Sequence, residues 1–171
     1  MRARRVVTVN GEDGRSRVMI DEPTAAHFDF GPLVISEVWK EPGPKPDLAR
    51  SDQLDSAGSA LVPPRGGSVC RLVTFAPRGY ERITPEVQAD MARRFDRTGG
   101  EYDPDRAGFH TTNTIDYGIV VDGEIDMVLD DGVVHLRAGD CVVQRGTGHA
   151  WHNNSEAPCT MAFILISAET A

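Results

Sequence analysis

Three polar side chains interrupt otherwise apolar, strand-like runs in the last third of the chain, and their types suit metal binding or proton transfer. They are His110, Asp116 and His149. Imidazole and carboxylate groups bind divalent metals, and imidazole is also the side chain that titrates nearest neutral pH. Two histidines and one carboxylate form the ligand set of non-haem Fe(II) sites that leave positions open for substrate and oxygen. The sequence therefore predicts either a site for a divalent metal (Fe, Mn, Ni or Zn) or a metal-free histidine–aspartate pair.

The runs around these residues alternate apolar and polar positions, which is typical of antiparallel strands. Between residues 114–121 and 124–129, Asp122-Gly123 supplies a pair favoured in two-residue hairpin turns. The apolar run 161–166 is expected to be a strand buried on both faces. Five or six strands within about sixty residues indicate a sandwich or a small barrel.

Strand parity extends the candidate site beyond the three polar residues. Because side chains alternate across a strand, Thr112 is expected to share a face with Asp116, and Trp151 to share one with His149. Thr112 and Trp151 are therefore candidates for contact with a substrate. Arg145 precedes the turn before His149 and is a candidate for binding an acidic group. His149 and Asp116 are the candidate catalytic pair for acid–base chemistry.

The first of these clusters resembles a known motif. His110, Thr112, Asp116 and Gly123 have the spacing of the first motif of the cupin superfamily, which reads His-x-His, then Glu, then Gly. Thr112 stands where the family usually has its second histidine, and Asp116 stands where it has glutamate. Both departures bear on metal binding, since threonine is a poor ligand and aspartate is one methylene shorter.

A second segment resembles the other cupin motif. Gly139-Asp140 is followed by a turn, by His149 and, four residues later, by Asn153. The turn at 145–148 lacks the usual proline. Together the two motifs cover roughly residues 109–166. The resemblance implies an all-β fold: a single-domain cupin-type β-barrel, jelly-roll-like and antiparallel, with one inserted surface helix.

The resemblance implies a small-molecule enzyme of cupin type. Such an enzyme would depend on a divalent metal and would act on an oxygen-bearing organic acid or phenol. Dioxygenase-like oxidation is the commonest reaction of this kind, and decarboxylation and isomerisation also fit. Two alternatives stay open: a metal-free lyase, dehydratase or epimerase that uses His149 and Asp116, and a non-catalytic cupin that binds a small ligand. No organic cofactor is expected. Cupins often pair through N-terminal strands, so a homodimer formed through residues 5–9 is expected.

The whole chain, residues 1–171, is expected to form one domain. Residues 1–68 would supply N-terminal strands, including a hairpin at 5–20, and a long Pro-rich loop. Residues 69–166 would form the barrel core. A helical insert at about 85–96 is indicated by Thr84 as its cap, with Pro85 in its first turn.

Composition excludes several classes of partner. The formal net charge of −8 and the pI near 5.0 make nucleic acid and anionic membranes unfavourable partners. No run of eighteen apolar residues exists to span a bilayer, and the N-terminus reads as a strand rather than a signal peptide. The three cysteines show no paired short spacing, which is typical of reduced thiols in a cytoplasmic protein.

Overall fold

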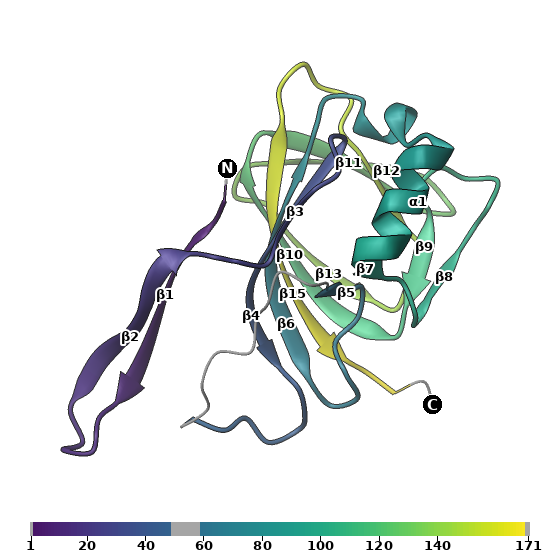
Figure 1. The fold of residues 1–171 in the computed structure, drawn as a ribbon. Helices are drawn as coiled ribbons and strands as arrows, with labels where there is room; N and C mark the ends of the chain where they lie inside the picture. The colour runs from purple at the N-terminus through teal and green to yellow at the C-terminus, as the bar shows by residue number, and fades with distance from the viewer. Residues whose placement is uncertain (1, 49–58, 170–171) are drawn as a thin grey trace.

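Antiparallel sheets make up most of the structure, a computed structural model that describes residues 2–48 and 59–169 (Figure 1). The larger sheet has six strands, in the spatial order β13 (Cys141–Arg145), β10 (Thr114–Asp122), β15 (Cys159–Ser167), β6 (Ser68–Phe75), β4 (Leu33–Glu41) and β3 (His27–Asp29). The smaller sheet has three strands, in the order β12 (Val133–Arg137), β11 (Glu124–Val128) and β14 (Ala150–His152). Every pairing in both sheets is antiparallel.

One apolar core joins the two sheets. Phe163 and Leu165 of β15 belong to the same buried cluster as Ile125 and Met127 of β11, so the sheets face each other across this core. Burial alternates along β15, and Ile166 is 40% exposed. The prediction that this strand is buried on both faces is therefore wrong, because the six-stranded sheet turns only one face toward the core.

The chain crosses between the two sheets at Asp122-Gly123, which corrects the predicted hairpin there. β10 pairs with β13 and β15, whereas β11 pairs with β12 and β14, so β10 and β11 are not partners. Gly123 has a φ of +80°, and a Cβ on it would lie 2.7 Å from the carbonyl oxygen of Pro158. Glycine is thus required by both backbone conformation and close approach, but the result is a corner rather than a hairpin.

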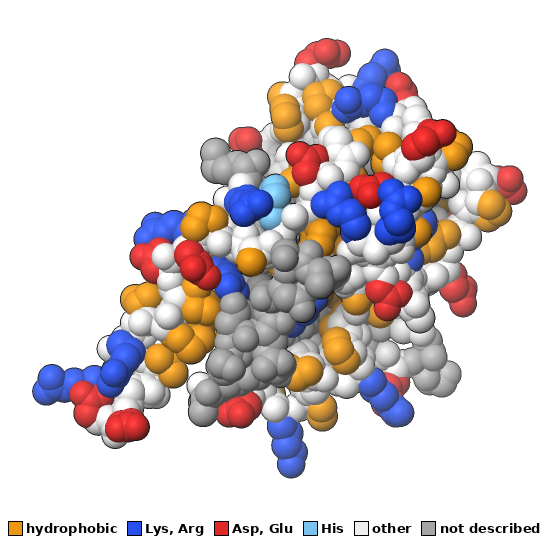
Figure 2. Space-filling view, viewed as in Figure 1, with side chains coloured by type: hydrophobic (Ala, Val, Ile, Leu, Met, Phe, Trp, Pro, Cys, Tyr) orange, Lys and Arg blue, Asp and Glu red, His pale blue; other side chains and the backbone are white. Residues whose placement is uncertain are grey.

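The predicted N-terminal hairpin is present as β1 (Arg4–Asn10) and β2 (Ser16–Pro23), which pair antiparallel. It projects away from the two sheets as a separate arm (Figure 1). Figure 2 shows apolar side chains among charged ones along this arm, where Val6 and Val18 are more than half exposed. Of the Pro-rich loop that was expected to follow, residues 49–58 lie outside the described residues.

The inserted helix α1 (Pro85–Arg94) begins where predicted. The Thr84 hydroxyl accepts a hydrogen bond from the backbone N–H of Val87 at 3.4 Å, which caps the helix. The helix ends two residues earlier than predicted, because Phe95–Asp96 form strand β7, parallel to β5 (Ser59–Ala60). Val87 and Met91 pack against the core cluster, but no residue of the helix is fully buried, so α1 is the predicted surface helix with one side turned toward the core.

The segment after α1 approaches the sheets through a second small pair of strands, β8 (Gly100–Tyr102) and β9 (His110–Thr112). A short 3₁₀ helix, η1 (Gly79–Arg82), precedes α1. None of the helices within the described residues is long and apolar enough to cross a membrane. All three cysteines are free thiols. The single-domain organisation and the cytoplasmic location stay predictions.

Candidate functional site

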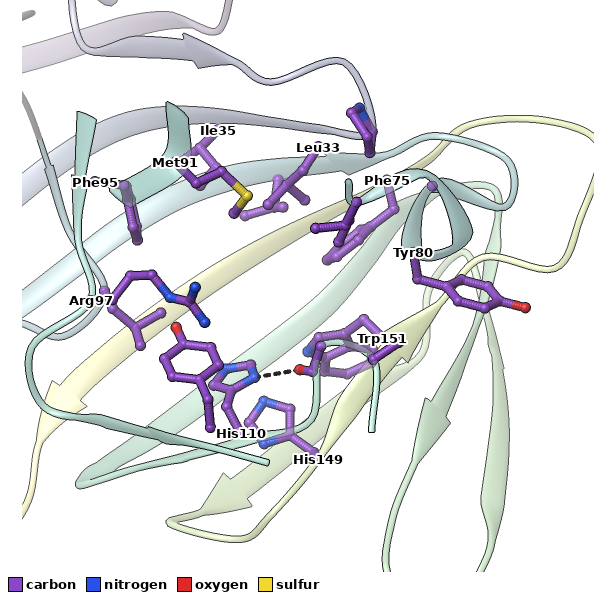
Figure 3. Close-up of a pocket in the computed structure, with 18 of the residues that line it drawn as sticks. Leu33, Ile35, Phe75, Tyr80, Met91, Phe95, Arg97, His110, His149 and Trp151 are labelled. Atoms are coloured by element: carbon purple, nitrogen blue, oxygen red, sulfur yellow. Dashed lines mark hydrogen bonds between the residues drawn. The ribbon is translucent and has the colours of Figure 1, made fainter. Parts of the chain in front are cut away.

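A cavity of about 520 Å³ opens between the two sheets, α1 and the β8–β9 pair. Apolar side chains form much of its wall, among them Ile35, Phe75, Met91, Trp151 and Phe163. Figure 3 shows His110 and His149 side by side at this cavity, with Leu33, Ile35 and Met91 on the opposite side. A site of this size and lining suits a small organic molecule with a large apolar surface.

The backbone holds the two histidines next to each other. His110 opens β9, and His149 directly precedes β14. The two residues form an isolated antiparallel bridge in which each backbone N–H donates to the carbonyl oxygen of the other, at 2.9 and 3.0 Å. Their ring centroids lie 4.5 Å apart. Residues 39 positions apart in the sequence are therefore positioned as a pair by main-chain hydrogen bonds.

Backbone carbonyls also fix the tautomer of both rings. His110 Nδ1 lies 2.8 Å from the carbonyl oxygen of Gly108, and His149 Nδ1 lies 2.9 Å from that of Thr147. A carbonyl oxygen only accepts, so each Nδ1 carries the hydrogen and each neutral Nε2 keeps its lone pair. Neither Nε2 is bonded to a residue that the structure describes, which leaves both lone pairs free for a ligand in the cavity.

Burial keeps these imidazoles neutral. Loss of solvation, reinforced by the neighbouring His110, lowers the pKa of His149 from 6.5 to about 4. Burial also lowers the pKa of His110, an effect to which the positive charge of Arg97 adds. At neutral pH the pair therefore presents two uncharged nitrogen bases.

Aromatic rings enclose the pair. Tyr102 of β8 stacks on His110 with ring centroids 5.3 Å apart, and the Arg97 guanidinium lies 3.5 Å from the Tyr102 centroid. On the other side, Trp151 packs edge-on against His149, with centroids 5.9 Å apart. These contacts restrict ring rotation and exclude water from one side of each imidazole.

Asp116 does not complete the predicted three-residue ligand set. An unbroken strand was expected from His110 to Asp116, but it is interrupted at Asn113. His110 therefore belongs to the β8–β9 pair, whereas Asp116 belongs to the large sheet. Asp116 lines the same cavity. Within residues 2–48 and 59–169, however, no three His, Cys, Asp or Glu side chains form a group placed to hold a metal. The donor set thus fits two histidine ligands, and the metal itself stays a prediction.

Of the other three predicted site residues, one lines the cavity and two do not. Trp151 lines the cavity, as expected for a residue that contacts substrate. Thr112 is buried but does not line it, and its hydroxyl lies 2.8 Å from that of Thr114. Arg145 is exposed, because its neighbour Gln144 occupies the inward-facing position of β13. The structure therefore places Arg145 outside the cavity and Gln144 on its wall, and a role of Arg145 in substrate binding stays a prediction.

The wall formed by the large sheet carries polar groups that the sequence did not reveal. Arg71 of β6 is 4% exposed and forms an ion pair of 3.3 Å with Glu37 of β4. Burial lowers the pKa of Arg71, which Glu37 and Asp116 oppose. Burial raises the pKa of Asp116, which the Thr114 hydroxyl and the Arg71 charge oppose.

These residues escaped prediction for an identifiable reason. Arg71 and Glu37 interrupt the alternation of β6 and β4 with an inward-facing charge, and that break was their only signal in the sequence. Tyr102 and Arg97 lie in the insert, where no pattern indicated that the chain returns to the histidines.

Other motif residues have structural roles. Asn153 is 1% exposed, and its Nδ2 donates to the carbonyl oxygens of Phe75 and Ala157 at 3.0 and 2.8 Å. The Asp140 carboxylate accepts from the backbone N–H of Arg137 at 2.8 Å. Asn153 and Asp140 thus hold backbone segments at the ends of the sheets.

Comparison with known proteins agrees with this geometry. Residues 99–166, which contain both histidines and the strands that carry them, match the family model described as a cupin domain. The chain belongs to the cupin superfamily. This confirms the predicted cupin fold, here a β-sandwich of two facing antiparallel sheets. The cupin domain of Cnp3 from Schizosaccharomyces pombe has the same fold, with a TM-score of 0.50 and 9% identity over 95% of this chain and 85% of that one.

Two fungal relatives are more similar in sequence. Phomopsin biosynthesis cluster protein C' from Diaporthe leptostromiformis is 47% identical over 130 residues, which is 72% of this chain and 55% of the relative. A cupin-domain-containing oxidoreductase from Hypocrea virens is 33% identical over 107 residues, 60% of this chain and 42% of the relative. The chain spans about half the length of these curated relatives.

Proposed function

We propose that this cupin is an enzyme that moves a proton on a small, largely apolar molecule, with the His110–His149 pair as proton acceptor and donor. The observation that carries the proposal is the pair itself: two adjacent buried imidazoles with Nδ1–H bound to a carbonyl and Nε2 free at an apolar cavity. A general base needs a free lone pair within reach of the substrate, and this geometry supplies two.

The environment of His149 favours one direction of transfer. Because burial makes its protonated form unfavourable, the imidazolium formed when Nε2 takes a proton from the substrate is a stronger acid than an exposed imidazolium. It returns that proton readily, either to another carbon of the substrate or to a departing hydroxyl. Isomerisation and dehydration both fit this cycle, in which one proton leaves the substrate and one is returned. His110, with its ring centroid 4.5 Å from that of His149, is the second base of the pair that is placed to carry this proton. These reactions belong to the metal-free class that the sequence left open as an alternative to a metal-dependent enzyme, with His110 replacing Asp116 as the partner of His149.

The experiment is deuterium incorporation from D₂O, followed by proton NMR. A suitable probe is 1-phenylbutane-1,3-dione, an apolar molecule with acidic protons between two carbonyls. We expect the protein to accelerate exchange at that carbon over buffer, and His149→Gln to abolish the acceleration. His135→Gln is the matched control, because His135 is exposed on β12 and bonds to Asp126. Equal exchange with wild type and His149→Gln would refute the proposal.

A second candidate is metal-dependent oxidation, in which the oxidation is supported by similarity to the cupin-domain-containing oxidoreductase of Hypocrea virens. The free Nε2 atoms of His110 and His149 would hold the metal, and the metal would supply Lewis-acid or redox chemistry when bound. No third His, Cys, Asp or Glu of the described residues is placed to join the two histidines, so the remaining ligands would have to be water or substrate. Elemental analysis of protein purified without an affinity tag or chelator tests this. About one Fe, Mn, Ni or Zn per chain, lost in both His110→Ala and His149→Ala, would establish it.

A further inference from the structure

The cavity wall formed by the large sheet carries polar atoms without partners. Asp116 of β10 and Gln144 of β13 are directly opposite in the antiparallel ladder, so their side chains lie on the same face. They are 5% and 4% exposed, and both line the cavity. Asp116 Oδ1, Gln144 Oε1 and Gln144 Nε2 have no hydrogen-bond partner within the residues that the structure describes.

Arg71 completes this wall on β6. Its Nη2 donates to the carbonyl oxygen of Ala60 at 2.8 Å, and its Nε has no partner among the described residues. Glu37 neutralises the charge of Arg71 and also accepts a hydrogen bond from the Ser59 hydroxyl. We call Asp116, Gln144 and Arg71 the polar wall. Taken together with Glu37, it offers hydrogen bonds but no uncompensated positive charge.

An unpaired polar atom in a buried site costs about 1–3 kcal/mol, so such atoms in folded proteins normally have a partner. Here the atoms without partners include a donor, the Gln144 amide N–H, and two acceptors, Gln144 Oε1 and Asp116 Oδ1. The group that satisfies them must itself carry both a donor and an acceptor. A ketone would leave the acceptors unpaired, and a carboxylate would bring a negative charge next to Asp116 and Glu37.

We propose that the polar wall binds a carboxamide or lactam group on a ligand whose remaining surface is apolar. The ligand's carbonyl oxygen accepts from Gln144 Nε2, and its N–H donates to Gln144 Oε1 or to Asp116 Oδ1. The apolar body then lies against the aromatic lining, within reach of the histidine pair. This inference names the substrate class of the proposed enzyme and rests on that proposal only for the reaction, because binding itself needs no turnover.

The test uses three probes of matched shape: 3-phenylpropanamide, 4-phenylbutan-2-one and 3-phenylpropanoate. Dissociation constants are measured by protein-observed NMR titration at neutral pH. We expect the amide to bind about tenfold more tightly than the ketone and the carboxylate, because one net hydrogen bond changes a dissociation constant by about that factor. Gln144→Met removes the amide at nearly constant shape and should abolish that preference. Gln144→Glu, which keeps the side chain's size but loses the donor, should weaken amide binding as well.

Two controls separate this inference from the proposed reaction. Arg145→Met changes the adjacent, outward-facing residue of β13 and should leave the preference unchanged. His149→Gln should keep the amide preference even though proton exchange is lost. Equal binding of the three probes, preference for the carboxylate, binding of none of them, or a preference that survives Gln144→Met would overturn the inference. None of these results would bear on whether the histidine pair transfers protons.

Discussion

Protonation of His149 is expected to destabilise the native protein at mildly acidic pH. The folded state lowers the pKa of this residue from 6.5 to about 4, so between these values the unfolded chain binds a proton that the native protein does not. The stabilisation is therefore fully present above pH 6.5 and is lost as the pH falls toward 4. His110 contributes with the same sign, because its pKa is also lowered.

The size of the effect follows from the pKa difference. A pKa lowered from 6.5 to about 4 corresponds to about 3 kcal/mol in total, and most of it should be lost by pH 4.5. His149 is only 4% exposed, so solvent screens little of this. Asp116 acts in the opposite direction, since its pKa is raised and its ionisation in the native state is unfavourable.

Urea unfolding of chelator-treated protein at pH 7.5 and 4.5 measures this loss, and His149→Gln isolates it. The variant keeps a polar side chain but cannot titrate at this position, so its free energy of unfolding should fall about 2–3 kcal/mol less than that of wild type over the same interval. The contribution of Asp116 is present in both proteins and cancels in the comparison. Parallel pH profiles for the two proteins, or an NMR titration that places the pKa of His149 near 6.5, would refute the argument that burial keeps this imidazole neutral.

Three further predictions concern the fold and its assembly. Gly123→Ala should lower the free energy of unfolding by about 1–3 kcal/mol in urea, whereas Gly132→Ala, which meets nothing within 4 Å, should cost less than about 1 kcal/mol. Asn153→Ala should cost about 2 kcal/mol by the same assay because two backbone carbonyls lose their donor. Asn154→Ala should cost less than about 1 kcal/mol, because its hydrogen bonds to Tyr80 and Asp126 are exposed to solvent. The projecting β1–β2 arm is expected to pair two chains, so sedimentation should show a dimer that Val6→Lys converts to a monomer; a wild-type monomer would contradict this.

The resemblance of two short motifs was sufficient to predict the cupin fold. Strands around Asp116 and Met127 follow from alternation, the strand around Phe163 follows from its apolar run, and the cap at Thr84 follows from residue type, because these signals are local. Which strands pair with each other was harder to predict from the sequence. Asp122-Gly123 has residues that suit a hairpin turn and also a corner between two sheets. Only the pairing of β10 and β11 in different sheets shows that it is a corner.

The sequence by itself determined the residue types at the site: two histidines, an aspartate and a tryptophan at strand spacing. Tertiary structure decided which of them meet. A break at Asn113 placed His110 and Asp116 in different sheets, and a backbone bridge then joined His110 to His149. The inward place of Gln144, the buried charge of Arg71 and the ring of Tyr102 also required the folded chain. Long-range contacts of this kind depend on how sheets stack across a core, and local spacing carries no information about that.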